Sequence, residues 1–172
     1  DNILNLAPFS YFNGVCSNPP TIMFAPARRG YDGSTKDTLN NIRDTKEFVV
    51  NLVSEEIVEP MVACATDYGK EVDEFKISNL TPINSEKISP PRLKESKVSY
   101  ECELHSIVDI GNAEPDAGFV VIGTIVMFHI ADDVYKDGRV DLKALNPIGR
   151  LAGNNYTRVF DNFKVIRKIK PD

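Results

Sequence analysis

The sequence predicts a mainly β protein, an antiparallel barrel with a few peripheral helices, formed as a single domain over residues 1–172. Three observations lead to this prediction. At least six stretches have the composition or alternation of strands, only two have the signals of helices, and most connections are short enough for hairpins. A chain with 42% hydrophobic residues is also long enough to bury a sizeable core.

The first elements are two strands separated by a stiff bend. Residues 3–12 alternate between two faces, which indicates a strand, and the apolar run 21–24 indicates a second, short one. Between them the chain is rich in Asn, Gly, Cys and Ser and is held by Pro19 and Pro20, since proline fixes its own φ and keeps the preceding residue extended. Asp1 and Asn2 read as the end of a hairpin turn whose first strand lies outside this sequence.

Two helices are expected next. Ser34 or Thr35 is placed to cap a helix over residues 36–45, and the β-branched run 48–53 indicates a buried strand after it. A second helix is predicted from Ser54, because the acids at positions 55 and 56 suit the positive end of a helix dipole. Pro60 must then lie near its first turn.

The rest of the chain is predicted to be β-rich. Residues 66–97 are polar and irregular, and because this stretch is too long for an ordinary loop we expect it to wrap the surface or a partner. Alternation or apolar character predicts strands at 98–110, 119–131 and 159–169, an acidic turn at 111–118, a turn at 137–138 and a glycine-spaced loop at 148–156.

Composition excludes several classes of protein. The net charge of −5 argues against nucleic-acid binding, and no apolar run approaches eighteen residues, so no membrane span is expected. Three cysteines without metal-ligand spacing favour a reduced, cytoplasmic location, and two histidines speak against a histidine-rich metal site. The basic residues near the end of the chain are interpreted as a solvated tail.

The bend at residues 5–20 is the first candidate for a functional site. Its hydroxyls, backbone N–H groups and neighbouring aromatic rings suit a flat ligand with polar edges. The second candidate is the segment Lys36-Asp37-Thr38 at a predicted helix start, where unpaired N–H groups and the dipole favour an anion such as phosphate. An ordinary capped surface helix explains the same residues, with Asp37 turned back toward the first-turn N–H groups.

Other chemistries find less support in the residues. Ser10 and Cys16 have no base nearby in the sequence, which disfavours a hydrolase or thiol enzyme. His129 is expected to be a hydrogen-bonded histidine of a sheet. Arg150 and Tyr156 in the glycine-spaced loop are suited to gripping a ligand, although an exposed turn explains them almost as well.

The chain resembles the flavin reductase-like family of FMN-binding split barrels along nearly its whole length. The most specific part of the resemblance is the run NLAPFSYFNGVCSNPP with its double proline, and the glycine loop is moderately specific. The matching runs are Asn5–Pro20, KDTLNNI at 36–42, EFVVNL at 47–52, VVIG at 120–123, HIAD at 129–132, DGRVD at 137–141 and IGRLAGNNY at 148–156.

The resemblance implies a homodimeric, six-stranded Greek-key split barrel with FMN in a groove at the subunit interface. It assigns Phe9, Ser10 and Tyr11 to the isoalloxazine, Asn13, Cys16 and Ser17 to the ring edge and ribityl chain, Lys36 and Thr38 to the phosphate, and Tyr156 to closing the groove from the same or the other subunit. Two departures stand out. Cys16 replaces a serine found in many relatives, and the family's leading strand is missing ahead of Asp1.

The expected activity is that of an FMN-dependent oxidoreductase, most simply a flavin reductase that passes hydride from NADH or NADPH to the flavin. The cofactor would carry out the chemistry, so no catalytic side chain and no metal are assigned. The main alternative is a non-enzymatic FMN-binding electron carrier or sensor. A third class is an interaction module that no longer holds the cofactor.

Overall fold

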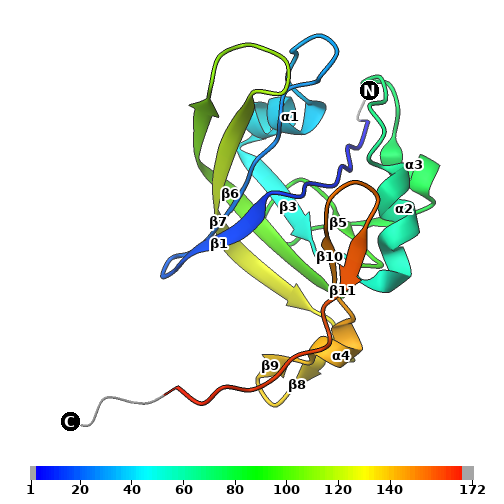
Figure 1. Ribbon diagram of the computed structural model, residues 1–172, viewed down its shortest axis with the longest axis vertical. Helices are drawn as coiled ribbons and strands as arrows, with labels where there is room; N and C mark the ends of the chain where they lie inside the picture. The colour runs from blue at the N-terminus through cyan, green and yellow to red at the C-terminus, as the bar shows by residue number, and fades with distance from the viewer. Residues whose placement is uncertain (1–2, 168–172) are drawn as a thin grey trace.

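A computed structural model describes residues 3–167 of the protein (Figure 1). The fold is mainly β with few helices, as predicted, and its largest part is one antiparallel sheet in the order β1-β2-β7-β6-β3. The sheet contains five strands within the described residues, so the expected count of six is too high by one. The strands are β1 (Phe12–Ser17), β2 (Pro20–Phe24), β3 (Glu47–Asn51), β6 (Val98–Ile110) and β7 (Gly118–Ile130).

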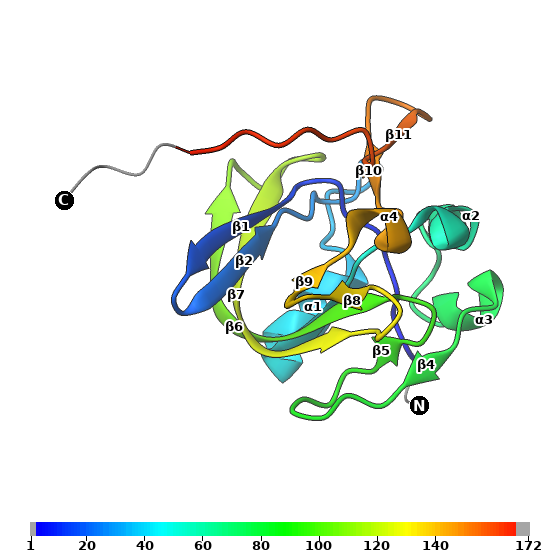
Figure 2. The same ribbon diagram turned by 90° about the horizontal axis from the view of Figure 1, so that it is seen from below.

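The long hairpin of β6 and β7 is the centre of this sheet. The two strands pair from Val98 opposite Ile130 to Ile110 opposite Gly118, with two register shifts along the way. Such irregularities increase the local twist of a sheet, and the sheet curves round its own inner face (Figure 2). The alternation at 98–110, the strand expected at 119–131 and the acidic turn between them were therefore predicted correctly.

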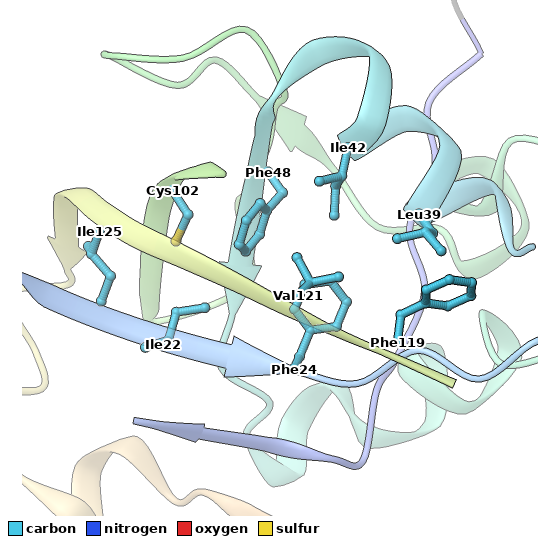
Figure 3. Packing of buried hydrophobic residues seen from close by; sticks show 9 residues of the cluster. All are labelled: Ile22, Phe24, Leu39, Ile42, Phe48, Cys102, Phe119, Val121 and Ile125. Carbon is cyan, nitrogen blue, oxygen red and sulfur yellow. The ribbon is translucent and has the colours of Figure 1, made fainter. Parts of the chain in front are cut away.

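The main core lies between the curved sheet and helix α1 (Asp37–Thr45). Leu39 and Ile42 point from α1 toward the sheet and are 1% and 2% exposed (Figure 3). The ring centroids of Phe24 and Phe48 are 5.5 Å apart in this layer. The cluster consists of Ile22, Phe24, Leu39, Ile42, Phe48, Cys102, Phe119, Val121 and Ile125.

A second, smaller core joins the short helices to the N-terminal segment. The predicted second helix is present as a 3-10 turn, Glu55–Ile57, followed by α2 (Val58–Ala63). The segment 66–97 is more ordered than predicted, since it contains α3 (Glu74–Ser78), β4 (Pro82–Ile83) and β5 (Arg92–Leu93). The cluster contains Ile57, Phe75, Leu80 and Leu93, with Leu4, Leu6 and Val53 packed against it.

The predicted strand at residues 3–12 is wrong, because residues 3–11 are extended without joining the sheet. Leu4 and Leu6 pack on the second core instead, and the Leu6 N–H donates to Glu74 Oε2 at 3.0 Å rather than to a neighbouring strand. The first strand is β1, which occupies residues that the sequence assigned to a loop. Pro19 lies in the turn between β1 and β2.

The C-terminal part also differs from the prediction. The turn at 137–138 joins β8 (Tyr135–Lys136) to β9 (Arg139–Val140), and α4 (Leu142–Leu145) follows. The glycine-spaced loop is a short hairpin of β10 (Ile148–Arg150) and β11 (Tyr156–Arg158). The strand expected at 159–169 is not formed over residues 159–167, where the chain is exposed and has no neighbouring strand to pair with, and positions 168–169 lie outside the described residues. No helix of the described chain is long and apolar enough to cross a membrane.

Candidate functional site

A small cavity lies beside the start of α1, between the N-terminal segment and the residues that follow α2. Its volume is about 40 Å³. Phe9 forms part of the wall on the side of the N-terminal segment, Lys36 and Thr38 come from the start of the helix, and Arg29 comes from the loop before the helix. The cavity therefore combines an aromatic ring, two cations and a hydroxyl at the positive end of a nine-residue helix.

Each of these polar side chains has a partner within the site. Arg29 Nη2 lies 2.7 Å from Asp37 Oδ2, Lys36 Nζ lies 3.3 Å from Asp67 Oδ1, and Thr38 Oγ1 donates to Asn5 Oδ1 at 2.6 Å. A hydrogen bond with Tyr31, followed by the charge of Asp37, raises the pKa of Arg29. Arg29 is thus a permanent cation that is already fixed in place.

The size and chemistry of the cavity fit the phosphate of a flavin mononucleotide but not its ring. A cavity needs roughly 10–15 Å³ to hold one water-sized group. This cavity therefore has room for about three such groups, which matches the number of terminal oxygens on a phosphoryl group. Asp37, Asp67 and Glu74 also line the cavity and oppose an anion. The side chains of Lys36 and Asp67 are both about one-third exposed, however, so Lys36 can exchange this carboxylate for a phosphate.

The structure brings three of the sequence-predicted residues together at this cavity: Phe9, Lys36 and Thr38. Ser10 lies directly after Phe9, and its Oγ accepts a hydrogen bond from Arg150 Nη1 at 3.2 Å. Arg150 is paired across the β10–β11 hairpin with Tyr156. The glycine-spaced loop that carries Tyr156 is therefore next to the N-terminal segment of the same chain.

Other predicted residues do not reach the cavity. Asn13, Cys16 and Ser17 lie on β1 and are exposed, and Cys16 Sγ donates to Asn18 O in the hairpin turn at 3.3 Å. The turn with the two prolines is at the tip of this hairpin, away from α1 (Figure 1). The two sequence candidates thus meet through Phe9 and not through the proline bend. Tyr11 is 73% exposed at the start of the hairpin.

Two expectations about the helix start are wrong. The N-cap position is Lys36, and neither Ser34 nor Thr35 caps the helix, because Ser34 bonds with Asp32 and Thr35 bonds with Asn40. Asp37 does not turn back to the first-turn N–H groups but pairs with Arg29. Some backbone N–H groups at the start of α1 are thereby left available to an anion.

The charged residues of the site that sequence reasoning missed include Arg29, Asp67 and Glu74. Arg29 lies seven positions before Lys36, in the loop between β2 and α1. The signal that could have identified it is the gathering of cations, Arg28, Arg29 and Lys36, ahead of one helix start. Asp67 comes from a segment far along the chain, so only the fold brings it here.

The remaining candidate groups lie elsewhere. His129 Nε2 is 2.6 Å from Oε1 of the buried Glu101, so it is a hydrogen-bonded histidine of the sheet, as predicted. Cys16, Cys64 and Cys102 are free thiols. Among residues 3–167 no group of three or more His, Cys, Asp or Glu side chains is arranged to hold a metal ion.

Comparison with known proteins gives a consistent result. A family model described as "Flavin reductase like domain" matches residues 1–145. An uncharacterised protein of Aquifex aeolicus is 40% identical over 96% of this chain and 82% of its own length. Nitrilotriacetate monooxygenase component B from Bacillus cereus is 38% identical, with a TM-score of 0.89 over 95% of this chain and 80% of that one.

A further solved structure is the 2-nitrobenzoate 2-nitroreductase NbaA of Pseudomonas fluorescens, which is 31% identical, with a TM-score of 0.83 over 98% of this chain and 80% of that one. The matching structures include a protein with a split barrel domain, which agrees with the curved antiparallel sheet found here. The chain belongs to the flavin reductase-like domain family, which places it among flavin-related oxidoreductases.

Proposed function

We propose that this protein is an FMN-dependent oxidoreductase that passes hydride from NADH or NADPH to its flavin, and that it works as a homodimer with the flavin at the subunit interface. Family membership supports the flavin. The observation that carries the choice of FMN is the cavity at the start of α1, which Arg29, Lys36 and Thr38 help to line and whose volume of about 40 Å³ holds about three water-sized groups.

Three features of this cavity support phosphate binding. The start of α1 contributes N–H groups and the positive end of the helix dipole. Lys36 adds a charge that is partly exposed and able to reorient, while Arg29 adds one that Asp37 holds in place. The hydroxyl of Thr38, now bonded to Asn5, is the third donor.

The ring of the flavin would lie outside this cavity, along the segment that continues from Phe9. Phe9 packs on the core, with its ring centroid 4.9 Å from that of Phe24, and so gives this segment a rigid aromatic base. Ser10 is fixed by Arg150, whereas Tyr11 is 73% exposed. A ring in this position would be open to solvent on one side in a single chain, and we assign its cover to a second copy. Asn13, Cys16, Ser17 and Tyr156 remain the proposed contacts of the ring edge and ribityl chain.

The protein's task in this reaction is to bind and orient. A bound flavin would supply the redox chemistry by accepting a hydride from the nicotinamide. The contacts to the FMN phosphate at α1 would set the position of the flavin ring relative to the N-terminal segment. A phosphate held by several donors has a fixed position and orientation, and this restricts where the ring of the same ligand can lie. No side chain is assigned as a general acid or base. The cytoplasm, where the nicotinamide cofactors are reduced, is the proposed location.

The test is to load the purified protein with FMN without oxygen and to add NADH and NADPH separately. We expect the flavin absorption to bleach with at least one of them at a rate well above that of free FMN under the same conditions. Protein that retains FMN without bleaching would identify a non-enzymatic electron carrier or sensor. Protein that fails to take up FMN would identify the third class, an interaction module.

A further inference from the structure

A second and larger cavity lies where the C-terminal end of β7 meets β5 and the residues that lead into β6. Its volume is about 370 Å³, against about 40 Å³ for the cavity at the start of α1, and no residue lines both cavities. Small organic molecules typically bind in sites of roughly 300–1,000 Å³. The second cavity is therefore large enough for such a ligand and is separate from the site described above.

The charge of this cavity is positive. Among the described residues that line it, four are basic and none is acidic. The cavity at the start of α1, by contrast, is lined by carboxylates as well as cations. A cluster of one sign of charge in a chain whose net charge is −5 reverses the field locally and favours an anion. The four basic residues are Arg92, Lys94, Lys97 and His129.

Two of these side chains contact one carboxylate that lies behind the wall. Arg92 Nε is 3.7 Å and His129 Nε2 is 2.6 Å from Oε1 of Glu101, which is fully buried on β6. Arg92 Nη2 also donates to Asn84 O at 3.2 Å, and Arg92 Nε is buried without a hydrogen-bond partner among the described residues. Because a guanidinium has five N–H donors, these contacts fix Arg92 without using all of its donors.

The two lysines differ in how far their charges are balanced. Lys97 Nζ lies 3.3 Å from Glu56 Oε2 and 3.7 Å from Asp133 Oδ2. Lys94 is exposed and has no carboxylate partner among residues 3–167. The positive charge left for a ligand is therefore close to one unit. A carboxylate, with one negative charge at pH 7, matches this better than a phosphate monoester, with about −1.5 to −2.

The rest of the wall includes exposed apolar side chains. Phe128 and Ile130 are two positions apart on β7, and so on one face of the sheet, and are 48% and 37% exposed. The Phe128 ring packs edge-on against Tyr100, with the ring centroids 5.2 Å apart, and is thereby held in place. Ile83 of β4 lines the same cavity. Adjacent exposed apolar groups mark a binding site more often than single ones do.

We propose that this cavity binds an organic monocarboxylate with an apolar body, of the kind represented by a medium-chain fatty acid. The carboxylate would pair with Lys94 and Arg92, because the planar fork of an arginine matches the geometry of a carboxylate. The apolar body would cover Phe128 and Ile130 and supply most of the affinity, while the cations set its orientation. The proposal concerns a site apart from the flavin cavity and does not depend on flavin binding.

The first experiment titrates ¹⁵N-labelled protein, without FMN, with butanoate, hexanoate and octanoate, and follows the backbone amide signals by NMR. We expect octanoate to shift the signals of residues 92–97 and 128–131. Each added methylene should tighten binding about twofold to fourfold, since it buries further apolar surface. Octanamide has the same length without the charge and should bind at least about tenfold more weakly than octanoate. Inorganic phosphate should also bind more weakly than octanoate.

The second experiment repeats the octanoate titration with variants of the two parts of the wall. Lys94→Glu and Phe128→Ala should each weaken binding by about threefold or more, the first through charge and the second through lost apolar contact. Lys76→Glu is the matched control, because it changes the net charge equally at a side chain that is 84% exposed and lies outside the cavity. Unchanged signals elsewhere in the spectrum should show that the variants are folded.

Four results would each overturn the proposal. They are octanoate that shifts no signal around the cavity, octanamide that binds as tightly as octanoate, phosphate that binds more tightly than octanoate, and equal effects of Lys94→Glu and Lys76→Glu. The bleaching assay with FMN and the nicotinamides tests a different site, so its answer is independent of these titrations.

Discussion

The side chain of Arg150 donates from Nη1 to Oγ of Ser10 at 3.2 Å, which joins two segments 140 positions apart in the chain. Ser10 follows the aromatic wall of the phosphate-sized cavity, and Arg150 belongs to the hairpin that carries Tyr156. The two motifs that resemble flavin-binding segments are thus neighbours within one subunit. This contact places the glycine-spaced loop beside the segment along which we propose that the flavin ring lies.

Replacing Lys36 with Glu should weaken FMN binding by about 1–3 kcal/mol, the scale of a charge-assisted hydrogen bond. The substitution exchanges a mobile cation of the cavity for an anion that repels phosphate. The matched control is Lys76→Glu, because the Lys76 side chain is 84% exposed and does not line the cavity. Titration of the apoprotein with FMN by fluorescence quenching measures both variants, and equal affinities would remove Lys36 from the site.

The three thiols should differ strongly in reactivity. Burial, with an added contribution from Glu101, raises the pKa of Cys102 to about 12, and burial also raises the pKa of Cys64. Because the thiolate is the reactive form, both should be almost inert at pH 8 in the folded protein. Cys16 is exposed and should react alone. A disulfide reagent that releases a coloured thiol counts the reactive groups. Rapid release of more than one equivalent before urea is added would contradict the burial of Cys64 or Cys102.

The buried carboxylate of Glu101 should contribute substantially to stability. It accepts the N–H groups of Glu86 and Lys87 at 2.8 and 2.7 Å and also bonds His129. Replacing Glu101 with Gln removes the charge that these donors solvate, and Arg92 loses its ion pair. We expect a loss of about 1.5–3 kcal/mol in the free energy of unfolding at pH 7, measured with urea.

The same substitution has a defined pH dependence. Burial alone would raise the pKa of Glu101, but the N–H groups of Glu86 and Lys87, together with His129, lower it overall. A carboxyl group whose pKa is lower in the folded state stabilises that state at pH values above its unfolded-state pKa of about 4.3. This stabilisation disappears as the pH falls through the folded-state pKa. The difference between the native chain and Glu101→Gln should therefore shrink below about pH 4. Glu103→Gln, on the exposed face of the same strand, should change the free energy by less than about 0.5 kcal/mol at either pH.

Gly123 should not tolerate a side chain. A Cβ added there would lie 2.4 Å from Cζ of Phe48 and 3.3 Å from the Glu103 carbonyl oxygen, so the aromatic ring would have to move within a packed core. We expect Gly123→Ala to destabilise the protein by about 1–3 kcal/mol. Gly14→Ala is the control, since nothing lies within 4 Å of its added Cβ. Equal melting temperatures for the two variants would contradict the packing of Phe48 against β7.

The parts of the fold that were predictable are those in which local pattern and final environment agree. Residues 98–110 form a strand, as their alternation indicates, because the apolar face of that strand packs on the main core. The helix that contains Leu39 and Ile42 forms for the same reason, although no side chain caps its start. Residues 3–11 alternate equally well, yet Leu4 and Leu6 meet the second core instead of a strand. Local pattern cannot distinguish these two partners, since both bury the same face.

The site was predictable to a similar degree. Phe9, Lys36 and Thr38 line one cavity although 27 positions separate Phe9 from Lys36, because the N-terminal segment lies beside the start of α1 in the fold. Asp67 could not be predicted, since its place depends on how the chain returns after α2. The resemblance groups Cys16 with Phe9 at the flavin, but Cys16 lies near the end of β1, toward the tip of the hairpin.

The central claim, that the cavity at the start of α1 holds the phosphate of FMN, is tested most directly by comparing the affinities of FMN and riboflavin for the apoprotein. The two ligands share the ring and the ribityl chain and differ only in the phosphate. The account predicts that FMN binds at least about tenfold more tightly, equivalent to about 1.4 kcal/mol, and that Lys36→Glu removes most of this difference. Equal affinities for FMN and riboflavin in the native chain would contradict it.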